Sequence, residues 1–510
     1  MTCSIADRVV RSLRTARSGA ADRPAGDGRW VPFLVFLLPV GVALACVLPG
    51  IGHRQLWRDE HDTWWASSIR YADLGLLIQH VDVVVAPFYA LMHAWTALAG
   101  TSPAALRLPQ GLAMAVSAGL LGLLGRQMFT PRTGLVAGLL FALVPTVTRY
   151  GHEARPYAFA VLFSLLATLL LLRALERPTL KGWALYTLAI TLTGLSHPVA
   201  LCVVAAHAVA VLRARRGGDH VAHWAFGCAA VMGTSAVVPM IAKGSEQAGQ
   251  IAWNNATVRD LTTYPMELFG TWFSGAVVMG LGVVGLLTAG RKAAVVPAVW
   301  AVLPPVLTFL TSDLFHLFVP RYLLFTVPAW LLLAAAGAVR CADVLAFGGR
   351  TGHLGRVAGG VLVTGVVAGF AFQVLPAVAT VRQDLPGEPD YAAAGRIVTA
   401  GQRPGDGIVY NGGFGARKAM AYELREGARP KDVLMKLTPQ QTGWYTADEC
   451  DVPAACLVGR RRLWLVSTAA GGTRSGMRAS TAAALAGRFT VVHTKRLHNL
   501  TVQLLERRNR

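Results

Sequence analysis

The residues that could do chemistry are most concentrated in Arg58-Asp59-Glu60-His61-Asp62, which places three carboxylates and a histidine in five consecutive positions. This stretch follows the first long apolar segment of the chain. A carboxylate beside an attacking hydroxyl group can take its proton, so Asp59 and Glu60 are candidates for a catalytic general base. The alternative is a solvated cap at the end of the apolar segment, in which Glu60 only pairs with Arg58.

Other ionisable and aromatic residues also stand at the ends of apolar segments. They are Asp82, Tyr89, His93, Glu153, Arg155, Tyr157, His197, Arg321 and Tyr322. A guanidinium group binds a phosphate through parallel hydrogen bonds and stabilises it as a leaving group, so Arg155 and Arg321 are candidates for a phosphate site. The others in this set are candidates for substrate binding. The alternatives are an ion pair of Glu153 with Arg149 or Arg155, and a capping or packing role for His197.

The composition is that of a membrane protein. Of 510 residues, 54% are hydrophobic and 15% are charged, whereas a soluble domain is typically about one quarter charged. The mean hydropathy is +0.47. The formal net charge is +21, but the basic residues fall in short clusters between apolar runs. Such clusters are typical of topology signals, and they argue against a nucleic-acid-binding surface.

The apolar runs predict an α-helical polytopic protein with about eleven transmembrane helices. We expect spans at about 31–51, 105–126, 133–149, 156–173, 182–196, 198–212, 221–242, 271–290, 293–311, 321–339 and 357–378. Together they form a catalytic domain over residues 31–380. Clusters of Arg and Lys in the 1–30 tail and in several loops predict a cytoplasmic N-terminus in the plasma membrane.

The segment 52–104 is expected to be the first extracytoplasmic loop. This requires that the apolar stretch 86–99 does not cross the membrane. It is only about 14 residues long, which is short for a span but suits a helix lying at the interface. The alternative is that 86–99 does cross, which would place Arg126 and Arg132 outside.

Residues 381–510 differ in character and predict a small extracytoplasmic α/β domain. Short apolar runs at 407–410, 463–466 and 490–492 are typical of strands, and they alternate with helical patterns at 391–400 and 478–485. Cys450 and Cys456 both lie here, and in an oxidising compartment we expect them to form a disulfide. The alternative is two separate buried thiols. The seven cysteines show no metal-binding spacing.

Five stretches together resemble a known family. They are Trp57-Arg58-Asp59-Glu60, Pro87-Phe88-Tyr89 with His93, Ser102 to Leu106-Arg107-Leu108-Pro109, Gly151-His152-Glu153-Ala154-Arg155-Pro156-Tyr157-Ala158 and Pro320-Arg321-Tyr322-Leu323. They look like the GT-C superfamily of polyprenyl-phosphate-dependent glycosyltransferases, and in particular the bacterial branch related to protein O-mannosyltransferases and the lipid A aminoarabinose transferase. The resemblance covers roughly residues 30–340.

The resemblance implies transfer of a sugar from a lipid phosphate, with inversion, on the extracytoplasmic side. In such a reaction Asp59 would be the base, and Arg155 and Arg321 would hold the donor phosphate. The chain departs from the family pattern at two places, and the first of them means that acceptor recognition cannot be carried over from the family. Many relatives carry a His-Pro-Pro-type motif where this chain has Asp82–Pro87, and His152 replaces a common glutamine.

The sequence therefore predicts a membrane glycosyltransferase that moves a sugar, mannose or another hexose, from a polyprenyl-phosphate donor to a protein, lipid or glycan acceptor. A requirement for a divalent cation stays open, because no dedicated set of oxygen ligands is evident. One alternative is a lipid or sugar transporter or flippase, which would place charges near the membrane midplane. Another is a non-catalytic scaffold whose outer domain binds a partner.

Overall fold

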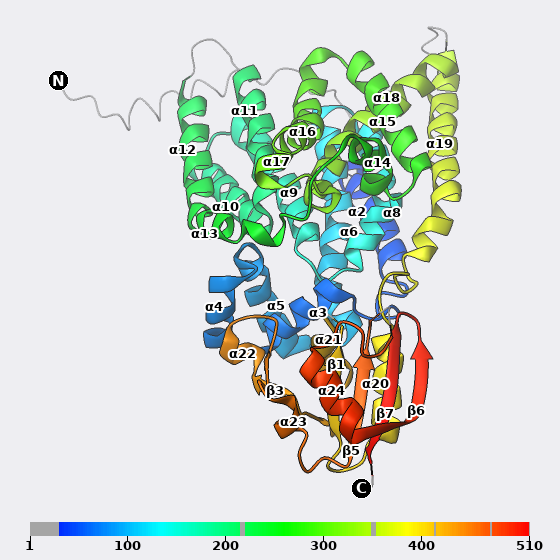
Figure 1. Cartoon of the computed structure of the whole chain (residues 1–510). Coiled ribbons are helices and arrows are strands. Elements are labelled where there is room, and N and C mark those ends of the chain that lie inside the picture. Colours follow the sequence, from blue (N-terminus) through cyan, green and yellow to red (C-terminus); the bar gives the residue numbers. More distant parts are fainter. Residues whose placement is uncertain (1–29, 215–219, 348–352, 413–414, 470–471, 509–510) are drawn as a thin grey trace, which may run out of the picture.

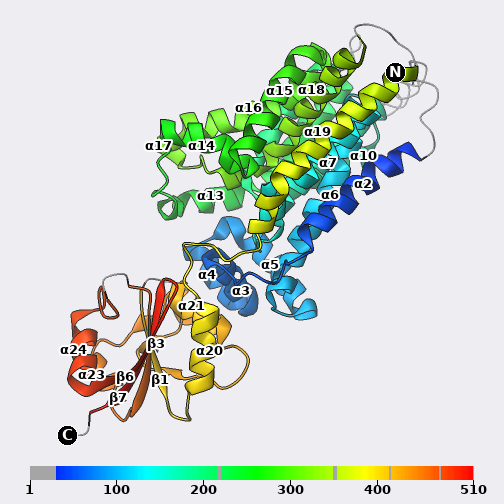
Figure 2. The same ribbon diagram turned by 90° about the vertical axis from the view of Figure 1, so that its right-hand side faces the viewer.

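The computed structural model describes residues 30–214, 220–347, 353–412, 415–469 and 472–508. The predicted basic tail thus lies, apart from Trp30, outside the described residues. A large bundle of helices forms one end of the molecule and a smaller α/β unit forms the other (Figure 1). A layer of short helices lies between them (Figures 1 and 2).

The bundle is built from apolar helices. Their bounds are α2 (Val31–Val47), α6 (Pro103–Met128), α7 (Pro131–Leu143), α8 (Pro145–Gly151), α9 (Tyr157–Glu176), α10 (Leu180–Ser196), η3 (Pro198–Cys202), α11 (Val203–Arg213), α12 (Val221–Ser235), α13 (Val238–Glu246), η4 (Ala248–Gln250), α14 (Val258–Phe269), α15 (Trp272–Thr288), α16 (Arg291–Leu310), α17 (Ser312–Phe315), η5 (Pro320–Thr326), α18 (Val327–Phe347) and α19 (His353–Thr380). One contiguous core of buried apolar residues runs through the bundle.

The predicted polytopic helical fold is confirmed, although the number of spans differs from a simple count of apolar runs. Among the described residues, five helices are each long and apolar enough to cross a membrane, or up to eight spans if each of three bent pairs counts as one. The predicted run 133–149 is one such pair, bent by 60° between α7 and α8. Pro145 begins α8, and a proline at this point interrupts the hydrogen bonding of a continuous helix.

The segment that the sequence assigned to an interfacial position is a helix outside the bundle. α3 (Arg58–Ser68), α4 (Tyr71–His80), η2 (Val83–Val85) and α5 (Ala86–Ala99) form the layer between the bundle and the α/β unit (Figure 2). α5 packs against α3, and a separate apolar cluster that includes Leu77, Tyr89 and Met92 holds the layer together. With 14 residues, α5 is short for a membrane span.

The C-terminal unit contains a five-stranded mixed sheet with helices on both faces. Its elements are α20 (Tyr391–Gly401), β1 (Gly407–Asn411), α21 (Gly415–Glu423), β2 (Lys431–Asp432), β3 (Met435–Leu437), α22 (Pro439–Thr442), β4 (Asp448–Glu449), α23 (Pro453–Cys456), β5 (Arg462–Ser467), α24 (Ala479–Arg488), β6 (Phe489–Leu497) and β7 (Leu500–Arg507). The strand order is β2-β1-β5-β7-β6. β1 is parallel to β2 and β5, whereas β7 is antiparallel to β5 and β6.

Side chains of the central strands alternate between two apolar cores, as the period of a strand requires. Trp464 and Val466 face a core with α20 and α21, whereas Leu463 and Leu465 face a second core with α24. The predicted small α/β region is therefore confirmed.

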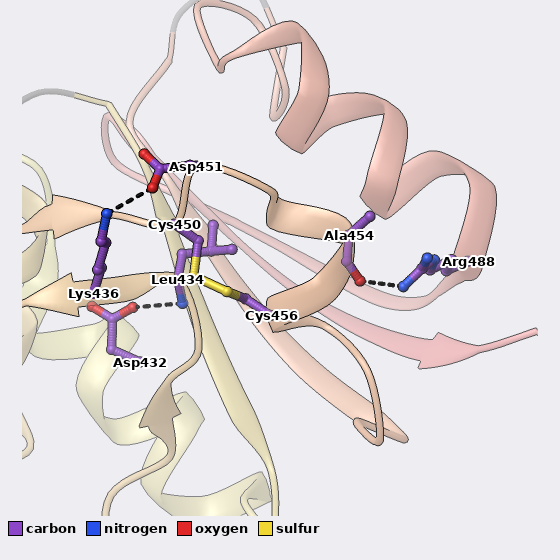
Figure 3. The surroundings of a disulfide bond; sticks show 8 residues. All are labelled: Asp432, Leu434, Lys436, Cys450, Asp451, Ala454, Cys456 and Arg488. Carbon is purple, nitrogen blue, oxygen red and sulfur yellow. Dashed lines mark hydrogen bonds and ion pairs between the residues drawn. A yellow bond between two sulfur atoms is a disulfide. The ribbon is translucent and has the colours of Figure 1, made fainter.

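Cys450 and Cys456 form a disulfide in this unit (Figure 3). The Cys450 backbone N–H donates to the Leu434 carbonyl oxygen at 2.8 Å. An ion pair between Lys436 and Asp451 lies beside it, with 2.6 Å between Nζ and Oδ2. The disulfide and these bonds join α23 to β3 and β4, which form a separate two-stranded sheet.

Two bundle helices approach each other closely because glycines face each other across their contact. A Cβ placed on Gly285 of α15 would lie 2.0 Å from the Leu333 carbonyl oxygen, and one on Gly337 of α18 would lie 2.1 Å from the Leu281 carbonyl oxygen. Small residues allow such close helix packing in membranes. Gly280, also on α15, has no atom within 4 Å of its added Cβ.

We expect Gly285→Leu to destabilise the bundle by about 1–3 kcal/mol, because overpacking forces the two backbones apart. The matched control is Gly280→Leu on the same helix, which should leave thermal stability unchanged. Thermal unfolding of the purified protein in detergent, followed by size-exclusion chromatography, measures both variants. Equal melting temperatures for the two variants would contradict the packing described here.

Candidate active site at the boundary between the bundle and the C-terminal unit

Glu60 is the most completely bonded acidic residue at this boundary. Its side chain is fully buried and pairs with Arg107, with 2.7 Å between Nε and Oε1 and 2.6 Å between Nη2 and Oε2. The Ala154 N–H donates to Oε1 at 2.9 Å, and the Trp57 N–H donates to Oε2 at 3.3 Å. Glu60 thereby joins the start of α3 to α6 and to the segment before α9.

Arg107 has its remaining N–H groups in use as well. Nη1 donates to the carbonyl oxygens of Ile51 and Arg54 at 3.0 and 2.9 Å, and Nη2 donates to that of Gln55 at 3.0 Å. No role was predicted for Arg107 from the sequence. The available signal was an arginine within an apolar helix, because a charge there must be paired or functional.

The environment of Glu60 keeps it ionised. Burial would raise the pKa of this carboxyl, but the Arg107 guanidinium, Arg54 and the Ala154 N–H together offset burial, and the pKa lies below its ordinary value. Its oxygens receive four N–H donors, so they are poorly placed to take a proton from a substrate. Of the two carboxylates proposed as the base, Asp59 is therefore the better candidate. Glu60 holds the turn on which Asp59 stands.

Asp59 is partly exposed and has only a loose partner. Its side chain is 14% exposed and lies 3.6 Å from Nε of Arg58, which is itself mostly exposed. Asp59 also interacts electrostatically with Arg155 and Arg321. The structure thus brings together the three residues that the sequence motifs assigned to the base and to the phosphate site.

Both arginines have a buried hydrogen-bond donor that is unused. Arg155 is 9% exposed and its Nε has no hydrogen-bond partner, whereas Arg321 is half-buried but its Nε atom is also buried without a partner. Arg155 Nη1 makes only long contacts, at 3.5 Å to the Asp59 carbonyl oxygen and 3.4 Å to the Tyr89 hydroxyl. A buried cation with free donors can bind an anion, and a phosphate matches the geometry of guanidinium groups.

Aromatic rings form a wall beside these arginines. The His197 ring lies 4.5 Å from that of Tyr322 and 5.9 Å from that of Tyr157, measured between centroids. The Arg321 guanidinium lies over Tyr322, 5.4 Å from its centroid. Arg321 therefore lies among the rings of His197, Tyr157 and Tyr322. These contacts agree with the packing role considered for His197. They also place the His197 ring at the edge of the candidate site.

Glu153 forms an ion pair with Arg149, which was one of the alternatives to a substrate-binding role. It is 1% exposed and pairs with Nε of Arg149 at 3.2 Å. Burial raises the pKa of its carboxyl, and Arg149 partly offsets this effect. The preceding His152 is fully buried and contacts the Val47 carbonyl oxygen, so the block from His152 to Arg155 is anchored to α2.

Two residues of the C-terminal unit reach acidic residues of the first loop. The hydroxyls of Tyr89 and Tyr445 donate to Asp82 Oδ2 at 2.7 and 2.8 Å. Lys418 pairs with Asp62. Tyr445 and Lys418 were not predicted from the sequence, because these contacts join positions more than 350 residues apart and have no local signal.

His93 is the substrate candidate that does not join this cluster. Its ring lies 4.3 Å from that of Tyr71 on α4, and the structure records no contact of His93 with the cluster residues. Across the described part of the chain, no group of three or more His, Cys, Asp or Glu side chains is arranged to hold a metal ion.

We expect Arg107→Met to destabilise the folded protein by about 3–5 kcal/mol, because the Glu60 carboxylate would stay buried without its counter-ion. The matched control is Arg70→Met, which removes an exposed pair with Asp73 and should not change the melting temperature. Thermal unfolding in detergent measures both. An Arg107→Met variant as stable as wild type would contradict the role given to this pair.

Comparisons with known proteins concern the family and the fold of the chain. Residues 58–242 match the family model described as dolichyl-phosphate-mannose-protein mannosyltransferase. No curated protein sequence matches the chain. Among solved structures, ArnT from Cupriavidus metallidurans bound to undecaprenyl phosphate is similar, with 13% identity, a TM-score of 0.57 and coverage of 92% of this chain and 97% of that one.

The archaeal oligosaccharyltransferase AglB from Archaeoglobus fulgidus, in complex with an inhibitory peptide and a dolichol-phosphate, is also similar. It has 12% identity, a TM-score of 0.50, and coverage of 86% of this chain and 69% of that one. The family match includes Asp59 and Arg155, and the structural matches extend the likeness to nearly the whole chain. The chain therefore has the fold of the GT-C glycosyltransferases, and the resemblance indicated by its sequence motifs is confirmed.

Proposed function

We propose that this protein is a membrane glycosyltransferase that moves a sugar from a polyprenyl-phosphate donor to an acceptor hydroxyl group. The observation that carries the proposal is the juxtaposition of Asp59 with two arginines, Arg155 and Arg321, whose Nε atoms are buried and have no hydrogen-bond partner. The similar ArnT and AglB structures are described with undecaprenyl phosphate and dolichol-phosphate, which supports a lipid phosphate as the anion.

The proposed reaction uses each group in one role. Arg155 and Arg321 bind the donor phosphate and stabilise the charge that develops on it as the bond to the sugar breaks. Asp59 takes the proton of the acceptor hydroxyl group, whose oxygen attacks the anomeric carbon with inversion. The products are the glycosylated acceptor and the free polyprenyl phosphate. The aromatic residues Tyr157 and Tyr322 lie beside the sugar or the lipid head.

The sugar and the orientation follow as parts of the same proposal. The family match favours mannose or another hexose. The first loop and the C-terminal unit lie at the same end of the bundle (Figure 2). We place this end outside the cytoplasm and the N-terminus inside, because the basic loops then face the cytoplasm. The acceptor is a protein, lipid or glycan exposed on the outer face.

We expect Asp59→Asn to lower sugar transfer by about 100-fold or more, because the amide cannot accept the acceptor's proton. The matched control is Asp73→Asn, because Asp73 is a partly exposed acidic residue on the neighbouring α4. The assay uses purified protein and a panel of radiolabelled polyprenyl-phosphate sugars. Normal transfer by Asp59→Asn would exclude the proposed base, and an absence of donor turnover by wild type would favour a transporter or scaffold.

We expect Arg155→Ala and Arg321→Ala to weaken binding of undecaprenyl phosphate, the reaction product, because each removes a cation from the phosphate site. Lys at either position should restore binding only in part, since an ammonium group cannot form the bidentate contact. Thermal stabilisation of the protein by undecaprenyl phosphate measures binding without turnover. Wild-type stabilisation of both alanine variants would contradict the assignment of the phosphate site.

A further inference from the structure

The C-terminal unit is docked firmly on the layer of α3, α4 and α5. α21 packs against α3, and the Tyr422 hydroxyl donates to the Thr101 carbonyl oxygen at 3.0 Å. His61 of α3 is buried between the rings of Tyr391 and Tyr422, with centroid distances of 6.0 and 5.8 Å. These contacts hold the unit at a fixed position over the candidate site.

The backbone of the C-terminal unit also approaches α4 very closely at one glycine. Gly443 has φ of +69°, and a Cβ added there would lie 2.7 Å from Leu76 and 2.9 Å from His80. The next residue, Trp444, stacks on His80 at 5.2 Å between ring centroids. Because glycine has no Cβ, it can adopt a positive φ and can also approach α4 this closely. Gly443 thereby holds the loop that carries Tyr445 against α4.

Two side chains of this unit extend into the acidic first loop. Lys418 is 4% exposed and pairs with Asp62, and its Nζ lies 3.9 Å from the centroid of the Tyr445 ring. The Tyr445 hydroxyl donates to Asp82 Oδ2 at 2.8 Å and lies 3.0 Å from the Tyr89 hydroxyl. A buried lysine is rare unless it is paired, so this arrangement depends on Asp62.

This set of contacts extends to Arg155, one of the two arginines proposed to bind the donor phosphate. The Tyr89 hydroxyl donates a hydrogen bond to Asp82 at 2.7 Å. Its oxygen can therefore accept a hydrogen bond from Arg155 Nη1, which lies 3.4 Å away. Asp82 itself has φ of 57°, which is unfavourable for a residue with a side chain. Its two phenol donors offset that strain and keep the carboxylate in place.

We propose that Tyr445 and Lys418 of the C-terminal unit are positioning residues for the donor site, acting on Arg155 through Asp82 and Tyr89. This inference rests on the proposed function. Tyr445 fixes Asp82, Asp82 fixes the Tyr89 hydroxyl, and the Tyr89 oxygen orients the Arg155 guanidinium. Lys418 neutralises Asp62, which would otherwise add a negative charge next to an anion site. The C-terminal unit thus completes the donor site.

The main test is Tyr445→Phe, which removes one hydroxyl and keeps the ring beneath Lys418. We expect the KM for the polyprenyl-phosphate sugar and the dissociation constant for undecaprenyl phosphate to rise about tenfold, with kcat changed less, because a hydrogen bond to a charged group is lost. The matched control is Tyr410→Phe, a tyrosine of the same unit whose ring lies under Arg417. It should leave both constants unchanged.

A second test separates positioning from simple stability. Lys418→Met should weaken binding of undecaprenyl phosphate, and adding Asp62→Asn should restore part of it, because the unpaired carboxylate is then removed. A purely structural role would instead lower the amount of folded protein and leave the constants of the folded fraction at the wild-type value. That result, or wild-type constants for Tyr445→Phe, would overturn the inference.

The two proposals fail in different ways. If wild type binds undecaprenyl phosphate but transfers no sugar, the proposed function fails, and the binding constants of Tyr445→Phe and Lys418→Met still decide the inference. If wild type does not bind undecaprenyl phosphate at all, both proposals fall. If Asp59→Asn abolishes transfer while Tyr445→Phe behaves as wild type, only the inference falls.

Discussion

The buried ion pair between Glu60 and Arg107 is the interaction on which the arrangement of the site depends. It connects α3, α6 and the segment before α9, and the Arg107 guanidinium also ties down the carbonyl oxygens of residues 51, 54 and 55. A buried pair is stable only when its remaining donors and acceptors are satisfied, and here they are. Because Asp59 and Glu60 are adjacent, fixing one fixes the backbone that presents the other.

Electrostatics distinguish the acidic residues that gather at this boundary. Glu60 is neutralised by Arg107, Glu153 by Arg149 and Asp62 by Lys418, while Asp82 receives two phenol hydrogen bonds. Asp59 has only a partly exposed contact with Arg58. A carboxylate whose oxygens already bind other residues is poorly placed to take a proton from a substrate, so Asp59 stands out among these carboxylates as the candidate base. The opposite holds for the arginines, since Arg155 and Arg321 keep unused donors for an anion.

The C-terminal unit has a closer relation to this site than its position at the end of the chain suggests. Lys418 and Tyr445 reach the first loop, and the aromatic contacts of His61, His80 and Tyr422 hold the two parts together. Its sheet, its helices and the disulfide between Cys450 and Cys456 form a rigid support for these side chains. The proposed positioning role follows from that support, because a loosely held tyrosine could not orient Asp82.

Much of the fold and part of the site followed from the sequence, because they depend on local patterns. Long apolar runs predict helices in a membrane, short apolar runs predict strands of the C-terminal unit, and the motifs around Asp59, Arg155 and Arg321 name residues that the fold does bring together. The tertiary structure alone decided which charges are paired. The partner of Glu60 is Arg107 and not the adjacent Arg58, and Tyr445 meets Asp82 across more than 350 residues. Such pairings depend on how distant elements pack, and no local pattern encodes them.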